Sequence, residues 1–196
     1  MRYAELKRKT SETDIMIELN IDGTGKREIN TGIGFFDHML DLFAKHGLFD
    51  LKVRCQGDTW IDDHHTVEDV GIVLGRCFAQ AISDKRGIRR YGQSLLPMDE
   101  VLCLCGIDLS GRQGLVFEEK FRRPEIKGFS TECVYEFFYS FAMNSQSNIC
   151  FKILSGINDH HKIEGIFKSF GRALRDASEY DERLEGDIPS TKGMLE

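Results

Sequence analysis

Alternating apolar and polar residues predict a β-strand near the start of each half of the chain. Between residues 15 and 21 every second side chain is apolar, and the run ends in Asp-Gly-Thr-Gly at 22–25, a sequence typical of a hairpin turn. A similar alternation over 102–106 precedes a second turn at 110–111. The pattern therefore predicts two strands that each lead into a hairpin.

Apolar residues at helical spacing predict a helix downstream of each of these turns. The two helices are expected at 36–45 and 134–143, because apolar side chains recur there every three or four residues. Short apolar runs at 49–55 and 149–154 then predict strands. Both halves thus have the same order: a hairpin, a helix, a strand, a loop and a second helix.

This repeated order predicts an internally duplicated α+β fold, in which each half forms a small β-sheet packed with helices. The expected boundaries are 1–92 for the first half and 93–182 for the second, followed by a polar tail at 183–196. No low-complexity linker separates the halves. The pattern fits one fused domain and equally fits two tightly packed repeats.

The strongest chemical signal is an Asp-His-His-x-x-Glu motif that occurs once in each half. The copies occupy 63–68 and 159–164, and each is followed, seven residues after its glutamate, by Gly-Arg at 75–76 and 171–172. Histidine together with carboxylate is a common combination of metal ligands. Since packing alone rarely repeats such a motif, we interpret the two copies as metal-binding cassettes at the starts of two helices.

Helix geometry suggests how each cassette would bind metal. Glu68 lies four residues after His64 and three after His65, so its carboxylate shares a helix face with either histidine. The adjacent histidines point about 100° apart, which assigns them to different sites. A structural alternative is that Asp63 and Asp159 are N-caps of two solvent-exposed helix starts. The candidate ligands in the cassettes are His64, His65, Glu68, His160, His161 and Glu164.

The distribution of histidine favours the metal interpretation, because the chain has only six histidines and the cassettes hold most of them. The other two, His38 and His46, lie about 12 Å apart along the first predicted helix and cannot share one ion. We include both as candidate ligands of different sites, although His46 also suits the carboxyl end of a helix dipole. The second half is expected to offer Phe137 and Ser145 at the matching positions.

Composition and charge narrow the class of protein. At 196 residues, with 41% apolar and 30% charged content, the chain can bury one core or two small fused ones. Its formal net charge of −6 argues against nucleic acid as a partner. The short, broken apolar runs predict neither a membrane-spanning helix nor a signal peptide. Six cysteines without C-x-x-C spacing are typical of reduced thiols, so we expect a cytoplasmic protein.

Four segments of the sequence carry a family resemblance. They are Thr-Gly-Ile-Gly-Phe-Phe-Asp-His-Met-Leu at 31–40, the two cassettes with their continuations at 63–69 and 159–168, and Pro-Ser-Thr-Lys-Gly at 189–193. Together they resemble the imidazoleglycerol-phosphate dehydratase family of histidine biosynthesis, in its stand-alone form. The resemblance extends over nearly the full chain, and several long motifs in the same order are far more specific than any single one.

The resemblance implies a hydro-lyase that removes water from imidazole glycerol phosphate to give imidazole acetol phosphate. The family has a duplicated α+β fold and assembles into 24-subunit shells with manganese sites between subunits. We therefore expect about two Mn²⁺ ions per chain, a small phosphorylated imidazole substrate and a homo-oligomer, with neither nucleic acid nor a membrane as partner. Metals on the ring nitrogens would favour an imidazolate and then a diazafulvene-like intermediate, whose neighbouring C–H is more acidic.

The resemblance also assigns roles to residues outside the cassettes. Glu12, in Thr-Ser-Glu-Thr at 10–13, is the implied acid/base carboxylate, whereas by itself it is typical of a solvated residue before a strand. The polar tail is implied to help bind the substrate phosphate. Taken singly, each of the implied phosphate ligands is typical of a surface residue. These ligands are Arg90, Arg112, Lys168, Ser190 and Lys192.

One position departs from the family pattern, and two other functional classes remain open. Leu42 stands where the family usually has glutamine, so one expected polar contact to the substrate is missing. A dinuclear metallohydrolase would use similar ligands, but the dominance of histidine over aspartate disfavours it. A non-catalytic metal-storage or assembly protein would not need the cationic residues Arg90, Arg112 and Lys192.

Overall fold

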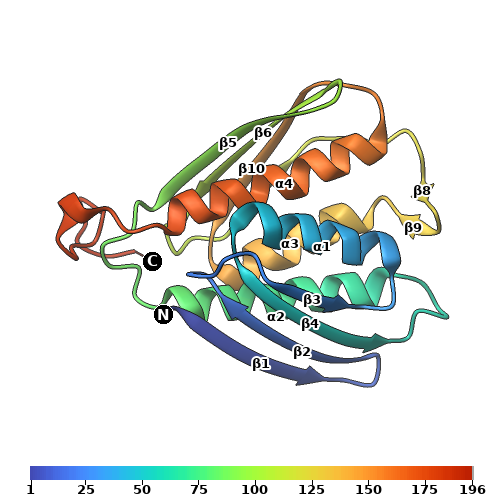
Figure 1. Ribbon diagram of the computed structural model, residues 1–196, viewed down its shortest axis with the longest axis horizontal. Helices are drawn as coiled ribbons and strands as arrows, with labels where there is room; N and C mark the ends of the chain where they lie inside the picture. Colours follow the sequence, from blue (N-terminus) through green and yellow to red (C-terminus); the bar gives the residue numbers. More distant parts are fainter. Residues whose placement is uncertain (196) are drawn as a thin grey trace.

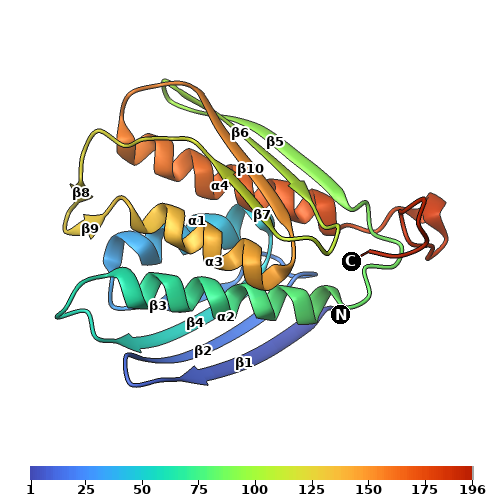
Figure 2. The same cartoon turned by 180° about the vertical axis from the view of Figure 1, so that it is seen from behind.

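In the computed structural model, which describes residues 1–195, four α-helices lie between two four-stranded β-sheets (Figures 1 and 2). The sheets form the two outer layers, and one pair of helices covers the inner face of each sheet. This arrangement confirms the predicted α+β class and its duplication. Within the described residues, no helix combines the length and the apolar character needed to span a membrane.

Each half contributes two helices, and the pair in one half is equivalent to the pair in the other. They are α1 (Gly34–Gly47), α2 (His64–Ile82), α3 (Cys133–Ser145) and α4 (Asp159–Ser178). Helices α1 and α3 are the two predicted from apolar spacing, whereas α2 and α4 begin in the two cassettes. Each cassette helix packs against the sheet of its own half and against the first helix of the other half, α2 on α3 and α4 on α1. The two halves are therefore interlocked through their helices.

The sheet of the first half has the strand order β1–β2–β4–β3. Its strands are β1 (Tyr3–Lys9), β2 (Thr13–Asn20), β3 (Arg27–Asn30) and β4 (Asp50–Gly57). Strands β1 and β2 form an antiparallel hairpin, β4 pairs antiparallel with β2, and β3 pairs parallel with β4. The strand that returns after α1 is thus inserted between β2 and β3.

This strand order contradicts the predicted hairpin after residue 21. The turn at 22–25 does not bring β2 and β3 together, because β4 lies between them. Instead the turn binds the start of β4, where Oδ1 of Asp50 accepts the N–H groups of Thr24 (2.8 Å) and Lys26 (2.9 Å). The hairpin of this half is the β1–β2 connection at 10–12. Local turn chemistry cannot reveal a strand that is inserted from later in the chain.

The second half repeats this topology. Its sheet has the order β5–β6–β10–β7, with β5 (Tyr91–Met98), β6 (Val101–Asp108), β7 (Gly114–Phe117) and β10 (Asn148–Ser155). Strand β10 again separates the two strands around the predicted second hairpin, so that prediction is wrong for the same reason. The second half also contains the short strands β8 (Glu125–Ile126) and β9 (Phe129–Ser130), and the 3-10 helix η1 (Glu182–Leu184) lies where the tail begins.

Buried apolar side chains from both halves form one continuous core between the sheets. Phe43 of α1 stacks on Phe170 of α4 with ring centroids 5.1 Å apart, and Phe78 of α2 lies 5.9 Å from Phe141 of α3. Because these contacts cross between the halves, the chain folds as a single unit. Strand β5 begins at Tyr91, so the predicted boundary after residue 92 falls just inside that strand.

Hydrogen bonds fix the polar tail against the segment that joins the two halves. The N–H of Gly87 donates to the carbonyl of Asp187 (2.9 Å), and the N–H of Asp181 donates to the carbonyl of Gly87 (2.8 Å). Farther along, Nη1 of Arg90 donates to the carbonyl of Pro189 (2.9 Å). The tail therefore lies beside the first residues of β5.

Candidate active site

The second cassette begins α4 with a capping residue that the sequence did not single out. The side-chain oxygen of Asn158 accepts the N–H groups of His160 (3.0 Å) and His161 (3.5 Å) and caps the helix. The neighbouring Asp159 is buried, and its Oδ2 accepts the backbone N–H groups of residues 122 and 123 at 2.8 Å each. Asp159 thus ties a loop to the start of the helix and is not its N-cap.

The first cassette begins α2 in a different way. Asp63 occupies the N-cap position, but its side chain makes no capping hydrogen bond. The N–H of His64 donates instead to Oδ1 of Asp62 at 2.8 Å. Asp63 is therefore the N-cap residue of α2 as the structural alternative expected, although its side chain does not cap, whereas Asp159 is not the N-cap of α4.

The structure brings one histidine of the first half together with the second cassette. Nε2 of His38 on α1 lies 3.1 Å from Oε1 of Glu164 on α4, and Nε2 of His160 lies 3.2 Å from the same oxygen. One ligand atom from each of these three residues lies within 4.8 Å of the other two. The predicted pairing of His160 with Glu164 is found, and His38 joins them from 126 positions away in the sequence.

The carboxylate at the centre of this cluster is strongly stabilised in its ionised form. Burial alone would raise the pKa of Glu164, but hydrogen bonds from Lys168, His38 and His160 lower it to about 2. Nζ of Lys168 donates to Oε2 of Glu164 at 2.7 Å. A buried anion surrounded by imidazole nitrogens and one ammonium group is the type of environment in which a cation is favourable.

Two close helix contacts define the equivalence between the halves. A Cβ on Gly171 of α4 would lie 2.5 Å from the carbonyl oxygen of Phe43, and a Cβ on Gly75 of α2 would lie 2.7 Å from that of Phe141. These glycines follow the two cassettes at the same spacing, so Phe43 and Phe141 are structurally equivalent. His38 lies five residues before Phe43, and Glu136 lies five residues before Phe141. Glu136 is therefore the counterpart of His38.

This equivalence corrects the predicted match of His38 with Phe137. Phe137 is fully buried, and its ring lies 5.4 Å from that of Phe36 in the core. Glu136 is half-buried and carries a carboxylate, so it is a candidate ligand that the sequence prediction missed. Counting back from each cassette does not find Glu136, because the segment between the first helix and the cassette differs in length between the two halves. The helix contacts are needed to align the halves correctly.

The first cassette forms a more open pair. Nε2 of His64 lies 3.8 Å from Oε2 of Glu68, and both side chains are about two-fifths exposed, at 42% each. This is the predicted i, i+4 relationship on one helix face. Within the described chain, the His64–Glu68 pair has no third ligand as close as His38 is to Glu164, so the first cassette provides an incomplete set of ligands.

The second histidine of each cassette faces away from the first, as helix geometry predicted. The rings of His64 and His65 are 6.2 Å apart and perpendicular, and those of His160 and His161 are 6.1 Å apart at 84°. Nδ1 of His65 lies 3.0 Å from Oδ2 of the buried Asp58. The hydrogen bond with Asp58 raises the pKa of His65. Each cassette therefore presents imidazole groups in two directions.

His161 has a corresponding carboxylate partner. Its Nδ1 lies 2.9 Å from Oε2 of Glu100, which is in the turn between β5 and β6. The hydrogen bond with Glu100 raises the pKa of His161. Sequence reasoning missed both carboxylates, because neither lies on the helix of its histidine: Asp58 follows β4, and Glu100 is in the turn between β5 and β6. Only the folded chain places them together.

His46 lies apart from these groups. It is half-buried near the end of α1, where burial and then the positive charges of Lys168 and Arg172 lower its pKa. The structure does not bring His46 into the cluster with Glu164. Its predicted role as a metal ligand stays a prediction.

Four of the predicted phosphate ligands line one cavity of about 440 Å³ near the start of β5. Arg90, Arg112, Ser190 and Lys192 share this cavity with side chains that include Ser110. Three cationic groups line this cavity together with hydroxyl side chains that include Ser110, Ser190 and Thr191, a composition suited to a phosphate. Lys168, the fifth predicted ligand, does not line this cavity but bonds to Glu164. We refer to this cavity as the cationic pocket.

Hydrogen bonds fix the guanidinium of Arg90 in the lining of the cationic pocket. Its guanidinium makes a bidentate contact with Asp108, with Nε 2.7 Å from Oδ1 and Nη2 3.2 Å from Oδ2, and also bonds to the carbonyl of Pro189. The hydrogen bond with Asp108 raises the pKa of Arg90. Arg90 thus joins β6 to the tail and positions the segment that carries Ser190 and Lys192.

Glu12 lies beside the first cassette. It is exposed in the β1–β2 turn, and its carbonyl accepts the N–H of Asp58 at 3.0 Å. Its Oε1 lies 3.9 Å from Nε2 of His65. The hydroxyl of Thr13, next to it, donates to the buried Oδ2 of Asp69 on α2 at 2.5 Å. The turn that carries the predicted acid/base carboxylate is therefore attached to the cassette helix.

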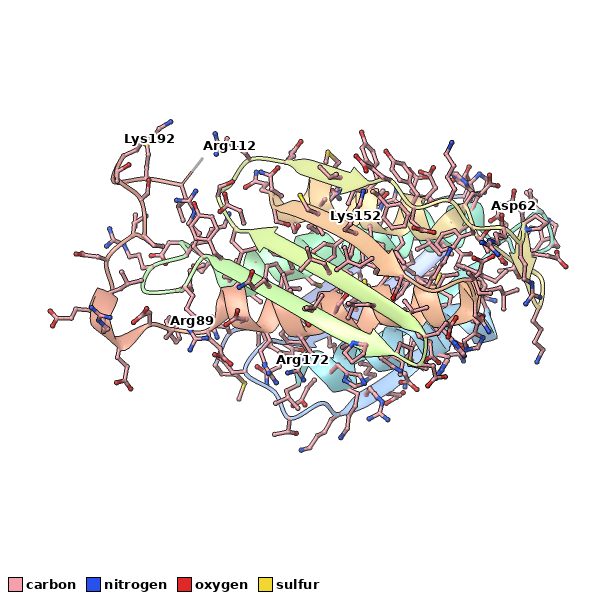
Figure 3. The ribbon with its side chains drawn as sticks, turned by 90° about the horizontal axis from the view of Figure 1, so that it is seen from above. Asp62, Arg89, Arg112, Lys152, Arg172 and Lys192 are labelled. Atoms are coloured by element: carbon pink, nitrogen blue, oxygen red, sulfur yellow. The ribbon has the colours of Figure 1, made fainter. Side chains whose placement is uncertain are left out.

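The cassettes and the cationic pocket lie at opposite ends of the chain. Figure 3 shows Arg112 and Lys192 at one end and Asp62, just before the first cassette, at the other. Both cassette helices begin at the same end (Figures 1 and 2). The first of them has 19 residues and is therefore roughly 28 Å long. A small substrate cannot bridge these two groups within one chain.

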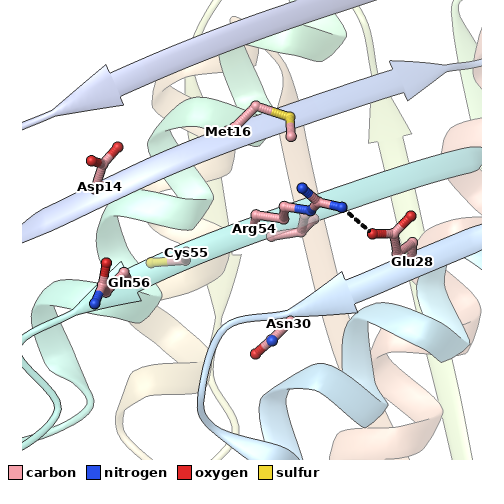
Figure 4. Close-up of a pocket in the computed structure, with 8 residues that line it drawn as sticks. Asp14, Met16, Glu28, Asn30, Arg54, Cys55 and Gln56 are labelled. Atoms are coloured by element: carbon pink, nitrogen blue, oxygen red, sulfur yellow. Dashed lines mark hydrogen bonds and ion pairs between the residues drawn. The ribbon is translucent and has the colours of Figure 1, made fainter.

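A separate hollow on the outer face of the first sheet contains none of the predicted site residues (Figure 4). Asp14, Asn30 and Gln56 line it, and an ion pair between Arg54 and Glu28 (2.7 Å) lies across it. We therefore place the candidate site at the cassettes and the cationic pocket. Leu42, at the position of the family's usual glutamine, is partly buried against the core.

Fold and site together define a duplicated α+β enzyme with an imidazole–carboxylate cluster and a cationic pocket. The family described as imidazoleglycerol-phosphate dehydratase matches residues 31–174. An imidazoleglycerol-phosphate dehydratase of Acetivibrio thermocellus is 57% identical over 194 residues, which are 99% of each chain. That of Hydrogenovibrio crunogenus is 54% identical, with 100% of each chain covered. The chain belongs to the imidazoleglycerol-phosphate dehydratase family.

Solved structures agree with this assignment. The imidazoleglycerol-phosphate dehydratase of Staphylococcus aureus has a TM-score of 0.83 at 37% identity, and the match covers 91% of this chain and 99% of that one. The enzyme of Pyrococcus furiosus in complex with (S)-C348 has a TM-score of 0.84 at 34% identity, over 97% and 100%. The chain is accordingly a hydro-lyase of histidine biosynthesis, and the hydrolase and metal-storage alternatives are not supported.

Proposed function

We propose that this chain catalyses the metal-dependent dehydration of imidazole glycerol phosphate to imidazole acetol phosphate by way of a diazafulvene-like intermediate. The observation that carries the proposal is the convergence of His38, His160 and Glu164 from two helices of different halves. Family membership supports the substrate and the elimination of water. The metal and the route depend on the residues themselves.

The donor set fits a divalent metal ion. Two imidazole nitrogens and one carboxylate oxygen within 4.8 Å of one another match the ligands that manganese and related metals accept. Glu164 is almost fully buried, and a buried carboxylate requires positive partners. At present Lys168 supplies that charge through its 2.7 Å bond. His38, His160 and Glu164 would therefore hold one ion.

The second ion would be held by residues of the first cassette. His64 and Glu68 share one helix face, and Glu136 is the counterpart of His38. His65 and His161 point away from these groups and are the natural donors to sites completed by another copy. We keep the expectation of about two Mn²⁺ ions per chain. When bound, such ions would acidify the substrate imidazole so that its ring electrons help to expel the hydroxyl group.

Residues of the chain supply the remaining steps. Glu12 is exposed on a turn that is anchored through Thr13 and Asp69, so its carboxylate can remove the proton from the carbon next to the one that loses water. Arg112, Ser190 and Lys192 bind the phosphate, whereas Arg90 binds it or holds the tail in place. Positioning the phosphate away from the ring fixes which carbon faces the base.

The separation of cassettes and cationic pocket supports a homo-oligomer with shared sites. Because roughly 28 Å separates the two ends of α2, the substrate needs its ring and its phosphate bound by different copies. A closed shell of 24 subunits, as the family resemblance implies, would satisfy this requirement with identical contacts throughout. Free cysteines fit reducing surroundings, so we place the reaction in the cytoplasm.

The proposal is tested with purified protein loaded with Mn²⁺. It should convert imidazole glycerol phosphate to imidazole acetol phosphate, lose this activity when a chelator removes the metal, and regain it when Mn²⁺ is restored. Size-exclusion chromatography with light scattering should give a large homo-oligomer. Full activity of protein shown by elemental analysis to contain no transition metal would overturn the metal part, and an active monomer would overturn the shared sites.

A further inference from the structure

The second histidine of each cassette makes a contact that the proposed reaction does not yet use. Nδ1 of His65 lies 3.0 Å from Oδ2 of Asp58, and Nδ1 of His161 lies 2.9 Å from Oε2 of Glu100. A carboxylate can only accept a hydrogen bond, so Nδ1 carries the proton in both imidazoles. Nε2 is then left with its lone pair, and it is the nitrogen available to a metal.

The two carboxylates come from elements that are not equivalent in the duplication. Asp58 directly follows β4 in the first half, whereas Glu100 lies in the turn between β5 and β6 of the second half. That turn corresponds to the β1–β2 turn, which carries Glu12. The same histidine contact therefore arises twice by different routes. Such convergence indicates that the contact itself is needed and is not simply inherited from the duplicated unit.

Asp58 is held by burial and by its backbone, whereas the Glu100 carboxylate has further hydrogen bonds of its own. Asp58 is 4% exposed, and its backbone N–H donates to the carbonyl of Glu12 at 3.0 Å. Oε1 of Glu100 accepts the N–H groups of Asn158 (3.0 Å) and Ile157 (3.4 Å), directly before the second cassette. Each carboxylate can therefore orient its imidazole without moving when a ligand binds.

We propose that Asp58 and Glu100 are positioning residues that hold His65 and His161 with Nε2 directed outward as the metal-binding nitrogen. The two hairpin turns differ in which carboxylate they provide to the histidine. In the second half the turn supplies Glu100 for Nδ1 of His161 and also Asp99, whose Oδ2 lies 3.5 Å from Nε2 of that histidine. In the first half Asp58, which is outside the turn, contacts Nδ1. The turn residue Glu12 does not contact Nδ1, and its Oε1 lies 3.9 Å from Nε2 of His65.

The inference rests on the proposed metal dependence, and the experiment separates the two. The assembled protein is loaded with Mn²⁺ and mixed with excess chelator, and the Mn²⁺ that remains bound is followed over time. If the unmodified protein binds no Mn²⁺, the proposed function fails. If it binds Mn²⁺ but the variants release it at the normal rate, only the positioning role fails.

We expect Asp58→Ala and Glu100→Ala each to accelerate release of one class of bound Mn²⁺ by about 10- to 100-fold, with a different class affected in each variant. Asp58→Asn keeps an oxygen that accepts from Nδ1, so it should release Mn²⁺ more slowly than Asp58→Ala. The control is Asp84→Ala, which removes an exposed carboxylate at the far end of α2 and should release Mn²⁺ at the normal rate.

Two results would overturn the proposal. One is release from Asp58→Ala and Glu100→Ala at the rate of the unmodified protein. The other is equal acceleration of both Mn²⁺ classes in each variant, since that is the signature of general loosening of the fold. If Asp58→Ala does not accumulate as folded protein, Asp58→Asn and Glu100→Ala decide the question by the same criterion. The half-exposed side chain of Glu100 makes that variant the less disruptive one.

Discussion

Gly171 of α4 lies against the backbone of Phe43 of α1 so closely that a Cβ would be 2.5 Å from the Phe43 carbonyl oxygen. This approach has a functional consequence, because the same two helices carry Glu164 and His38. Their ligand atoms are 3.1 Å apart only when the helix axes are this near. A small residue at a helix crossing thus sets the geometry of the His38–His160–Glu164 cluster, which lies two turns away along the helix.

Gly171→Ala should destabilise the protein by about 1–3 kcal/mol, because the added methyl group must push α1 and α4 apart. Gly165→Ala on the same helix is the matched control, since its nearest neighbour to a new Cβ is Cys103 at an ordinary 3.4 Å. The control should be neutral or more stable by up to about 1 kcal/mol, owing to the better helix propensity of alanine. Denaturant unfolding measures both, and equal stabilisation of the two variants would contradict the close approach.

Glu164→Ala and Glu68→Ala should each remove a ligand from a different metal ion. We expect either change to abolish most of the activity, and bound Mn²⁺ to fall from about two to about one per chain. Elemental analysis and turnover are measured on the same samples. Glu18→Ala, which removes a half-buried carboxylate of β2 that pairs with Lys52, is the control. Near-normal turnover and metal content in either cassette variant would show that cassette to be structural.

Lys192→Ala should weaken substrate capture by roughly tenfold to hundredfold, because it removes a charge-assisted contact to phosphate in the cationic pocket. Metal content and oligomeric state should be unchanged. The control variant is Lys7→Ala, which removes an exposed ammonium group from β1. Normal KM for the Lys192 variant would assign the phosphate to another group.

Glu12→Gln should slow turnover by roughly 10²- to 10⁴-fold while substrate and Mn²⁺ still bind, since the amide cannot accept the substrate proton. The control is Glu5→Gln on the adjacent strand β1, where an exposed carboxylate pairs with Lys7. Single-turnover kinetics with the metal-loaded enzyme separate the chemical step from binding. A normal rate for Glu12→Gln would place the base elsewhere.

Thiol reactivity should follow burial. Burial raises the pKa of Cys133 to about 12 and that of Cys103 to about 11, so these thiols carry almost no thiolate at about pH 8. Cys150 is exposed on the outer face of the second sheet. Iodoacetamide at about pH 8 should therefore label Cys150, as read by peptide mass spectrometry, and Cys150→Ser should abolish most of the labelling. Rapid labelling of Cys133 in folded protein would contradict its burial.

The amino-acid sequence by itself determined the parts of this protein that depend on local spacing. Apolar periodicity gave the positions of α1 and α3, and the doubled motif gave the starts of α2 and α4 and the pairing of His160 with Glu164. That the adjacent histidines point in different directions also followed from helix geometry alone, and in the second cassette His160 and His161 contact different carboxylates. These features involve residues within a few positions of one another, where backbone geometry fixes their relationship.

Only the tertiary structure decided which distant residues meet. It inserted β4 and β10 between the strands that the turn sequences had predicted to pair as hairpins, and it made Glu136 the counterpart of His38. It also brought Asp58 to His65 and Glu100 to His161, and it put the cationic pocket at the end opposite the cassettes. The physical reason is that helix crossings and strand order depend on the packing of the whole core, which no local pattern specifies.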